Sequence, residues 1–186
     1  YYYKYRIYFN DGFETLKSAG LSISSYWLTL AEFFDGSNWQ YVYDPLNPVV
    51  NYCSRVTMGI AKPTGANNPL KFTVDFQHAK PYEPEWQSSL WKYDSDLDVP
   101  INKWVTMEIY LKQGVGTDPQ NGGGQFYMYM TSDDGVRQTV FEINNDTYQA
   151  NKGYNGIDHA YLLKFYGNKN IFNWDDLDLR TSLPTE

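Results

Sequence analysis

Aromatic and polar side chains alternate with aliphatic ones in two neighbouring segments, 103–112 and 125–131. A strict period of two indicates strands, each with one buried face. Trp104, Tyr110, Tyr127 and Tyr129 share the other, polar face. Such a face suits a sugar, because CH groups lie on aromatic rings while hydroxyls bond to neighbouring polar groups. The alternation therefore predicts a carbohydrate-binding surface on paired strands.

Further aromatic and polar residues extend this expectation to other parts of the chain. Trp39 and Trp86 lie beside predicted loops that would rim a groove, and Trp91 and Tyr93 share one face of a predicted strand. The segment KFTVDFQH ends on Gln77 and His78, which supply hydrogen-bonding groups. The predicted ligand-binding residues are Trp39, Trp86, Trp91, Tyr93, Tyr110, Tyr127, Tyr129, Gln77 and His78.

Turn signals separate many short apolar or alternating segments, and no long amphipathic helix is evident. The predicted strands cover about 1–9, 25–34, 39–43, 51–61, 71–78, 86–93, 104–112, 125–131, 136–143, 159–166 and 171–179. Aromatic residues make up 18% of the 186 residues, which favours pleated, half-buried strands. The sequence predicts one all-β domain over 1–186, a sandwich or barrel.

The charge balance excludes some partners. The net charge of −7 disfavours nucleic acid and anionic membrane surfaces, because both attract basic patches. No apolar run approaches membrane-spanning length, and the first residues do not have the pattern of a signal peptide. Cys53 stands alone, so no disulfide forms within this chain, and a small buried hydrophobe is the expected role.

The segment from Val99 onward resembles the concanavalin A-like jelly rolls. The resemblance lies in WVTMEIYLK, a Gly-rich turn, the strand QFYMYM and a terminal NWDDLDL. It implies two antiparallel sheets and a place among lectin-type domains, carbohydrate-binding modules, glycoside hydrolases and polysaccharide lyases. It also implies an extracellular or cell-surface location, but fold alone does not fix function. The chain is expected to be a monomer.

The catalytic motifs of such relatives are mostly absent. Retaining glycosidases of this fold carry E-x-D-x-x-E, whereas here Asn144 stands where the run beginning at Glu142 requires an aspartate. Lyases of this fold use a Tyr or His base with Arg, Gln, Asn or His groups near the uronate carboxylate. If the chain is a lyase, the candidate residues are His78, Gln77 and Arg55.

The resemblance also implies a structural Ca²⁺. In these relatives a carboxylate near the N-terminus often meets an Asp of the last strand, and the matching positions are Glu14 and Asp175. By alternation Asp175 shares its face with Leu177 and Leu179, and an inward carboxylate requires a partner or a metal. Capping of a turn by Asp175 is the alternative.

Three functions follow from these patterns. The favoured one is non-catalytic binding of a polysaccharide or oligosaccharide through an aromatic-lined face. The second is a polysaccharide lyase or glycoside hydrolase of the same fold. The third is an adhesion or structural sandwich that binds protein, for which a large exposed apolar patch would be diagnostic.

Overall fold

The structure is a computed structural model, and it describes residues 1–20, 22, 28–35, 53–79, 91–112, 123–144, 159–165 and 173–180. Within these ranges, side chains are described at 1–20, 22, 28–33, 56–76, 92–112 and 123–144. The elements are β1 (Tyr2–Phe9), α1 (Gly12–Ser18), β2 (Leu28–Asp35), β3 (Cys53–Ala61), β4 (Lys71–Ala79), β5 (Trp91–Asp98), β6 (Lys103–Lys112), β7 (Gln125–Ser132), β8 (Arg137–Asn144), β9 (His159–Phe165) and β10 (Asn173–Arg180).

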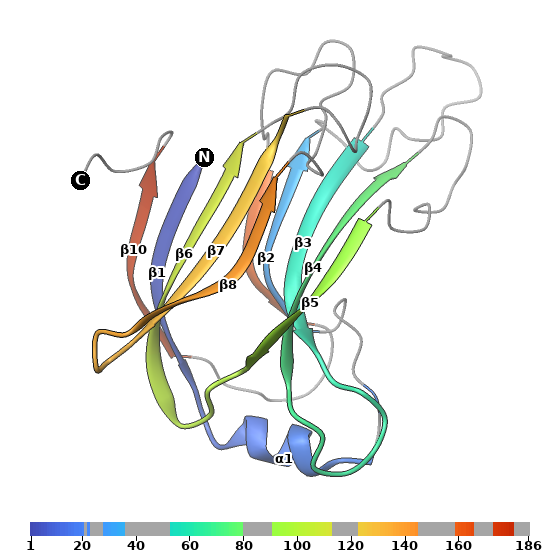
Figure 1. Ribbon diagram of the computed structural model, residues 1–186, viewed down its shortest axis with the longest axis vertical. Helices are drawn as coiled ribbons and strands as arrows, with labels where there is room; N and C mark the ends of the chain where they lie inside the picture. The colour runs from blue at the N-terminus through green and yellow to red at the C-terminus, as the bar shows by residue number, and fades with distance from the viewer. Residues whose placement is uncertain are drawn as a thin grey trace.

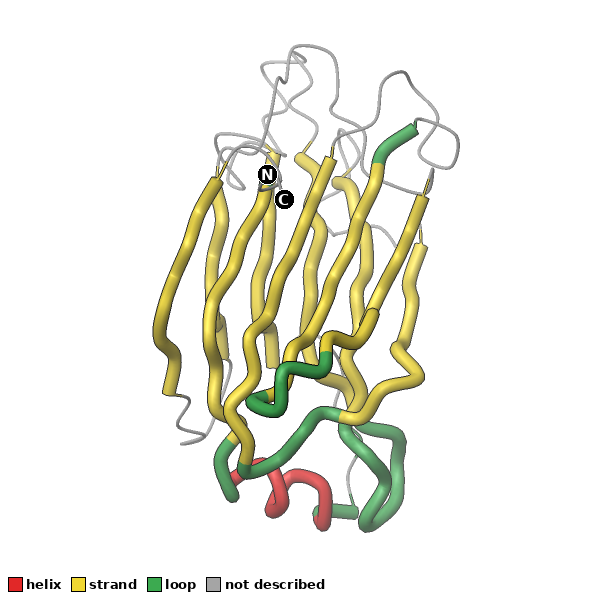
Figure 2. Tube along the Cα trace, turned by 60° about the vertical axis from the view of Figure 1, so that its left-hand side comes forward, coloured by secondary structure: helices red, strands yellow, loops and turns green. Residues whose placement is uncertain are grey.

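Two antiparallel five-stranded sheets form the two layers of a sandwich (Figure 1). The first sheet has the order β10-β1-β6-β7-β8, and the second has the order β5-β4-β3-β2-β9. The tube view shows α1 beneath one end of the strands (Figure 2). The prediction of an all-β sandwich is therefore confirmed.

The alternation of apolar and polar residues in β6 and β7 defines a buried and a polar face, as the sequence predicts. Val105, Met107, Ile109 and Leu111 are at most 1% exposed, while the residues between them are partly exposed. From the second sheet, Val56, Met58, Phe72, Val74 and Phe76 join the same core. The two sheets therefore bury their apolar faces against each other, which leaves each sheet one face that points away from the core.

Helix α1 lies between two predicted strands, in a segment to which the sequence analysis assigned no helix or strand. Phe13 is fully buried, and its ring meets Phe9 edge-on at 5.3 Å between centroids. Leu16, three residues later, packs against the same core. Seven residues give too few turns for a helical period to show in the sequence, so packing of Phe13 decides the structure here.

The buried lysine Lys62 ties the α1 end of the sandwich together. Its Nζ donates hydrogen bonds to the carbonyl oxygens of Ala19 and Gly65, both at 2.6 Å, and to that of Pro63 at 3.4 Å. Backbone bonds from Gly65 to Gly20 and from Asn67 to Lys17 dock the same loop on the end of α1. Lys62 as a whole is only 2% exposed, and these carbonyl oxygens accept the hydrogen bonds of its ammonium group.

Strand β5 lies farther along the chain than the predicted strand 86–93, so the boundaries of that prediction were wrong. It covers Trp91–Asp98 and forms the edge of its sheet. Its polar residues Asp94, Asp96 and Asp98 are exposed. An edge strand tolerates charged residues that a central strand excludes, which is why a strongly polar segment forms a strand here. In the described part of the chain, no helix is long and apolar enough to cross a membrane.

The hydroxyl of Tyr5 yields a stability prediction. Tyr5 is 3% exposed, and within the described structure its hydroxyl has no hydrogen-bond partner. We expect Tyr5→Phe to leave the free energy of unfolding unchanged or to raise it by up to about 1 kcal/mol, because an unsatisfied buried hydroxyl is removed. Urea unfolding measures the change.

Tyr2→Phe is the matched control for Tyr5→Phe. Tyr2 is equally buried, but its hydroxyl donates to Glu108 Oε1 at 2.7 Å. Removal of that bond is expected to lower the free energy of unfolding by about 1–2 kcal/mol. A loss of similar size in both variants would show that the Tyr5 hydroxyl has a partner in solution.

Candidate functional site

The non-core face of the first sheet, called here the open face, carries the tyrosines that the sequence singled out. Tyr110 and Tyr127 lie opposite each other on β6 and β7, and their rings stack at 5.6 Å with an interplanar angle of 24°. The ring centroid of Tyr129 lies 6.3 Å from that of Tyr127. The structure therefore brings these three predicted binding residues together on a partly exposed surface.

Neighbouring groups already occupy ring surfaces on the open face. The guanidinium of Arg137 lies 3.8 Å from the ring centroid of Tyr129, and that of Arg6 lies 4.9 Å from the ring of Trp104. Tyr110 and Tyr127 cover one face of each other. These contacts stabilise the sheet as cation–π and cross-strand pairs, and they leave less ring surface for a sugar.

The charged and polar groups of the open face are also paired. Glu108 accepts hydrogen bonds from the Tyr2 hydroxyl at 2.7 Å and from Arg137 Nε at 3.2 Å. The Tyr127 hydroxyl donates to Asn144 Oδ1 at 2.6 Å. The open face thus consists largely of side chains that bind one another.

Two tyrosines of the open face, Tyr127 and Tyr129, are poorly suited to act as a general base at neutral pH. Partial desolvation raises the pKa of Tyr127 above its ordinary value, and the nearby Glu142 raises it further. Partial desolvation also raises the pKa of Tyr129, against an opposing effect of Arg137. Both phenols are therefore protonated near neutral pH and do not supply a general base.

The non-core face of the second sheet, called here the covered face, is different. It carries Thr29, Glu32, Thr57, Thr73 and Asp75, which are polar yet at most 2% exposed. Pairing places Glu32, Thr57 and Asp75 in one row across β2, β3 and β4. The Thr57 hydroxyl lies 3.4 Å from Glu32 Oε1 and donates to it. Polar side chains that are buried outside the core indicate a shielded, polar surface rather than a solvated one.

The strand register places two of the predicted lyase residues on this covered face. Arg55 on β3 lies opposite Gln77 on β4, two positions along from Thr57 and Asp75. His78 instead lies opposite Ser54, at a position whose alternation matches the core residue Phe76. The register therefore groups Arg55 with Gln77 and separates His78 from both.

Sequence reasoning missed several residues of the covered face. His159 and Tyr161 on β9 lie opposite Phe34 and Glu32 on β2, so they share the rows of Arg55 and Thr57. Only pairing of distant strands reveals this grouping. One local signal was present, since Glu32 interrupts the apolar run SYWLTLAEFF.

The structure describes only two of the remaining predicted aromatic residues, Trp91 and Tyr93. Trp39 and Trp86 lie outside the described residues. Trp91 and Tyr93 are on the edge strand β5, opposite Phe76 and Val74 of the core. Tyr93 is 38% exposed, which is high for that face and reflects the edge position.

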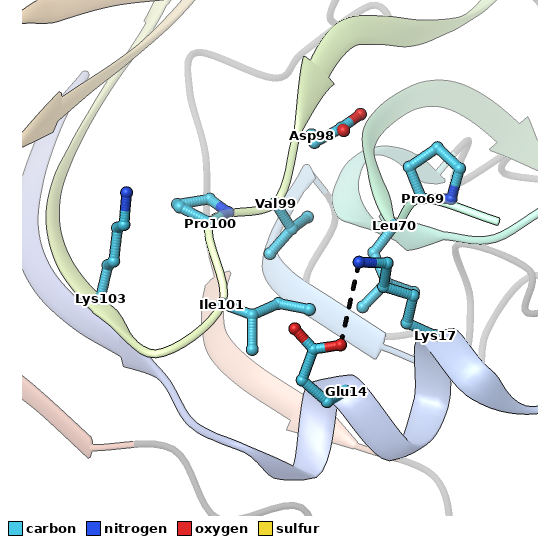
Figure 3. Close-up of a pocket in the computed structure, with 9 residues that line it drawn as sticks. All are labelled: Glu14, Lys17, Pro69, Leu70, Asp98, Val99, Pro100, Ile101 and Lys103. Atoms are coloured by element: carbon cyan, nitrogen blue, oxygen red, sulfur yellow. Dashed lines mark ion pairs between the residues drawn. The ribbon is translucent and has the colours of Figure 1, made fainter. Parts of the chain in front are cut away.

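A small pocket of about 210 Å³ opens beside α1 (Figure 3). Leu70, Val99 and Ile101 supply its apolar lining, and Glu14 and Lys17 lie at its rim. Glu14 Oε2 is 3.8 Å from Lys17 Nζ, and both side chains are substantially exposed. The charged groups at this rim are largely matched within the protein.

The two residues predicted to hold Ca²⁺ come from different elements. Glu14 is on α1, whereas Asp175 on β10 lies opposite Arg6 of β1. Within the described ranges, no group of three or more His, Cys, Asp or Glu side chains has the arrangement of a metal site. The calcium site stays a prediction.

Calcium binding has a direct test. If Glu14 and Asp175 hold Ca²⁺, millimolar CaCl₂ should raise the Tm of the wild type by several degrees through ligand linkage, relative to EDTA. Glu14→Gln should abolish that rise. Equal Tm values with CaCl₂ and EDTA would remove the metal from the account.

Comparisons with known proteins support the fold. No family model and no curated protein matches the chain. Among solved structures, the chain is similar to alginate lyase Aly36B, a double mutant in complex with an alginate trisaccharide. The TM-score is 0.55 at 12% identity, over 95% of this chain and 68% of that chain. At this identity the likeness shows a shared β-sandwich fold.

Proposed function

We propose that this domain binds a polysaccharide along the covered face and releases it uncut. The observation that carries the proposal is the burial of Glu32, Thr57 and Asp75 on a sheet face that points away from the core. Buried polar residues outside the core are costly unless they serve a site or a network. Because these side chains are at most 2% exposed, we expect them to support the site rather than to contact the sugar themselves.

Two further observations support this choice of face. The Thr73 hydroxyl is buried on the covered face, and within the described structure it has no hydrogen-bond partner. The open face, by contrast, has its rings and charges matched internally. The sandwich shared with an alginate lyase that holds a trisaccharide agrees with a carbohydrate ligand.

Lyase activity is a second candidate function, and the pairing of β2, β3, β4 and β9 is the observation that favours it. Arg55, Gln77, His159 and Tyr161 share the covered face. In β-elimination a base such as His or Tyr removes the C5 proton of a uronate, the C4–O bond breaks, and the leaving oxygen takes a proton. A cation near the uronate carboxylate stabilises the carbanionic intermediate. These four residue types can supply such chemistry.

Affinity electrophoresis through gels that contain neutral or acidic polysaccharides tests both candidates. Retardation by one glycan that is recovered at full length supports binding without cleavage. Shortened glycan with unsaturated ends, detected by ultraviolet absorbance, overturns that proposal in favour of the lyase. Absence of retardation by every glycan overturns carbohydrate binding and favours the protein-binding sandwich.

Location and assembly remain predictions under this proposal. A polysaccharide ligand fits an extracellular or cell-surface domain, and a single sandwich suffices for the covered face. Size-exclusion chromatography with light scattering tests the predicted monomer.

A further inference from the structure

We infer that backbone carbonyl oxygens beside α1 form a site for a monovalent cation, which the ammonium group of Lys62 fills in the wild-type protein. Lys62 Nζ lies 2.6 Å from the carbonyl oxygens of both Ala19 and Gly65, and 3.4 Å from that of Pro63. In potassium channels, rings of backbone carbonyl oxygens likewise replace the hydration shell of K⁺. This site is independent of the proposed glycan-binding face.

Backbone hydrogen bonds that do not involve the Lys62 side chain hold these oxygens in place. The Gly65 amide donates to the Gly20 carbonyl oxygen at 3.2 Å. The Asn67 amide donates to the Lys17 carbonyl oxygen at 2.9 Å. Gly65 has a φ of +120°, a backbone conformation that favours glycine. The loop and the end of α1 therefore keep the oxygens together when the ammonium is removed.

The chemistry of the three described oxygens suits a monovalent cation. All three belong to neutral backbone carbonyls, so they supply no formal negative charge. Sites for Ca²⁺ and Mg²⁺ generally include carboxylates, and Mg²⁺ also requires a near-octahedral arrangement. A primary ammonium ion has three N–H donors, which match three acceptors. The site is separate from the predicted calcium position, which depends on the carboxylates of Glu14 and Asp175.

The covalent stem of Lys62 explains why the wild-type site needs no dissolved ion. Lys62 directly follows β3, so the second sheet holds the ammonium beside α1. A tethered group has a high effective concentration at its site, whereas a free ion must be taken from solution. Lysine is almost never fully buried unless its charge is paired, and Lys62 is 2% exposed. The ammonium therefore acts as a built-in cation that links β3, α1 and the following loop.

Lys62→Ala in n-propylammonium chloride provides the first test. The atoms that alanine lacks relative to lysine are those of n-propylammonium, so this ion can refill the space and return an ammonium to the oxygens. We expect about 100 mM n-propylammonium to raise the Tm of Lys62→Ala by about 3 °C or more, with saturation, relative to an equal concentration of tetramethylammonium. Tetramethylammonium has the same charge but no N–H donor. Equal Tm values in the two salts would overturn the inference.

Lys62→Met and Lys71→Ala are the matched controls. Methionine replaces the stem of Lys62 with a side chain of similar volume, so it leaves no space for n-propylammonium. Lys71 pairs with Asp98 at the surface, at 2.7 Å, so its removal opens no buried site. We expect n-propylammonium to change the Tm of either control by less than about 1 °C relative to tetramethylammonium. A rise in either control equal to that of Lys62→Ala would assign the effect to general ion binding and overturn the inference.

The wild-type protein provides a second measurement, which decides the inference if Lys62→Ala does not fold. Ammonium protons of exposed lysines exchange rapidly with water, whereas those of a buried, carbonyl-bound ammonium exchange slowly. We expect the NMR spectrum of the ¹⁵N-labelled wild type at low temperature to contain an ammonium signal that is missing from Lys62→Met. Absence of that signal in the wild type would show that the oxygens do not hold the ammonium and would overturn the inference.

Discussion

Gln77→Ala is expected to weaken binding of the retained glycan by about tenfold or more, while Gln125→Ala leaves it within about twofold. The loss of one well-placed hydrogen bond at a binding site costs about 1–2 kcal/mol, which corresponds to about a tenfold change in Kd. Gln77 lies opposite Arg55 on the covered face. Both substitutions replace a glutamine with alanine, one on each of the two sheets.

Gln125 is a close control for Gln77. It is a partly exposed strand residue on the open face, and its Nε2 donates to Asn144 Oδ1 at 3.3 Å. Isothermal titration calorimetry with the retained glycan measures both variants. A larger loss for Gln125→Ala than for Gln77→Ala would move the binding site to the stacked tyrosines of the open face.

Lys62→Met is expected to lower the free energy of unfolding by about 3 kcal/mol, more than any exposed lysine substitution. Lys62 Nζ donates to the three carbonyl oxygens of Ala19, Pro63 and Gly65. Methionine fills a similar volume but leaves these acceptors without the ammonium, and hydrogen bonds to a charged group contribute about 1.5–3 kcal/mol each. Guanidinium chloride unfolding measures the change.

Lys71→Met is the matched control for this substitution. Lys71 also donates to a carbonyl, that of Asp96 at 2.6 Å, and pairs with Asp98 at 2.7 Å. Because this pair is at the surface, its loss is expected to cost about 1 kcal/mol or less. Similar losses in the two variants would contradict a clamping role for Lys62.

Local periodicity predicted most of the fold. The alternation in β6 and β7 extends over whole strands, so it gave both the strand type and the buried face. The short helix α1 was missed because its position depends on burial of Phe13 by distant residues. The polar segment of β5 was missed because only its edge position makes such residues acceptable.

The candidate site was harder to predict than the fold. The alternation correctly placed Tyr110, Tyr127 and Tyr129 together. It cannot show that Arg137 packs on the ring of Tyr129, or that the rings of Tyr110 and Tyr127 stack on each other. The covered face depends on pairing between strands far apart in the sequence, such as β2 with β9. Gln77 and Arg55 were found by residue type, whereas the role of the buried Glu32 emerges only from its environment in three dimensions.

The most direct test of the central claim is an NMR titration of the ¹⁵N-labelled domain with the glycan that retards it. The account predicts that the largest backbone amide shifts fall in β3 and β4, around Arg55 and Gln77, with little change around Tyr127 and Tyr129 in β7. Shifts concentrated in β7 and β8 would contradict the account and place the glycan on the open face.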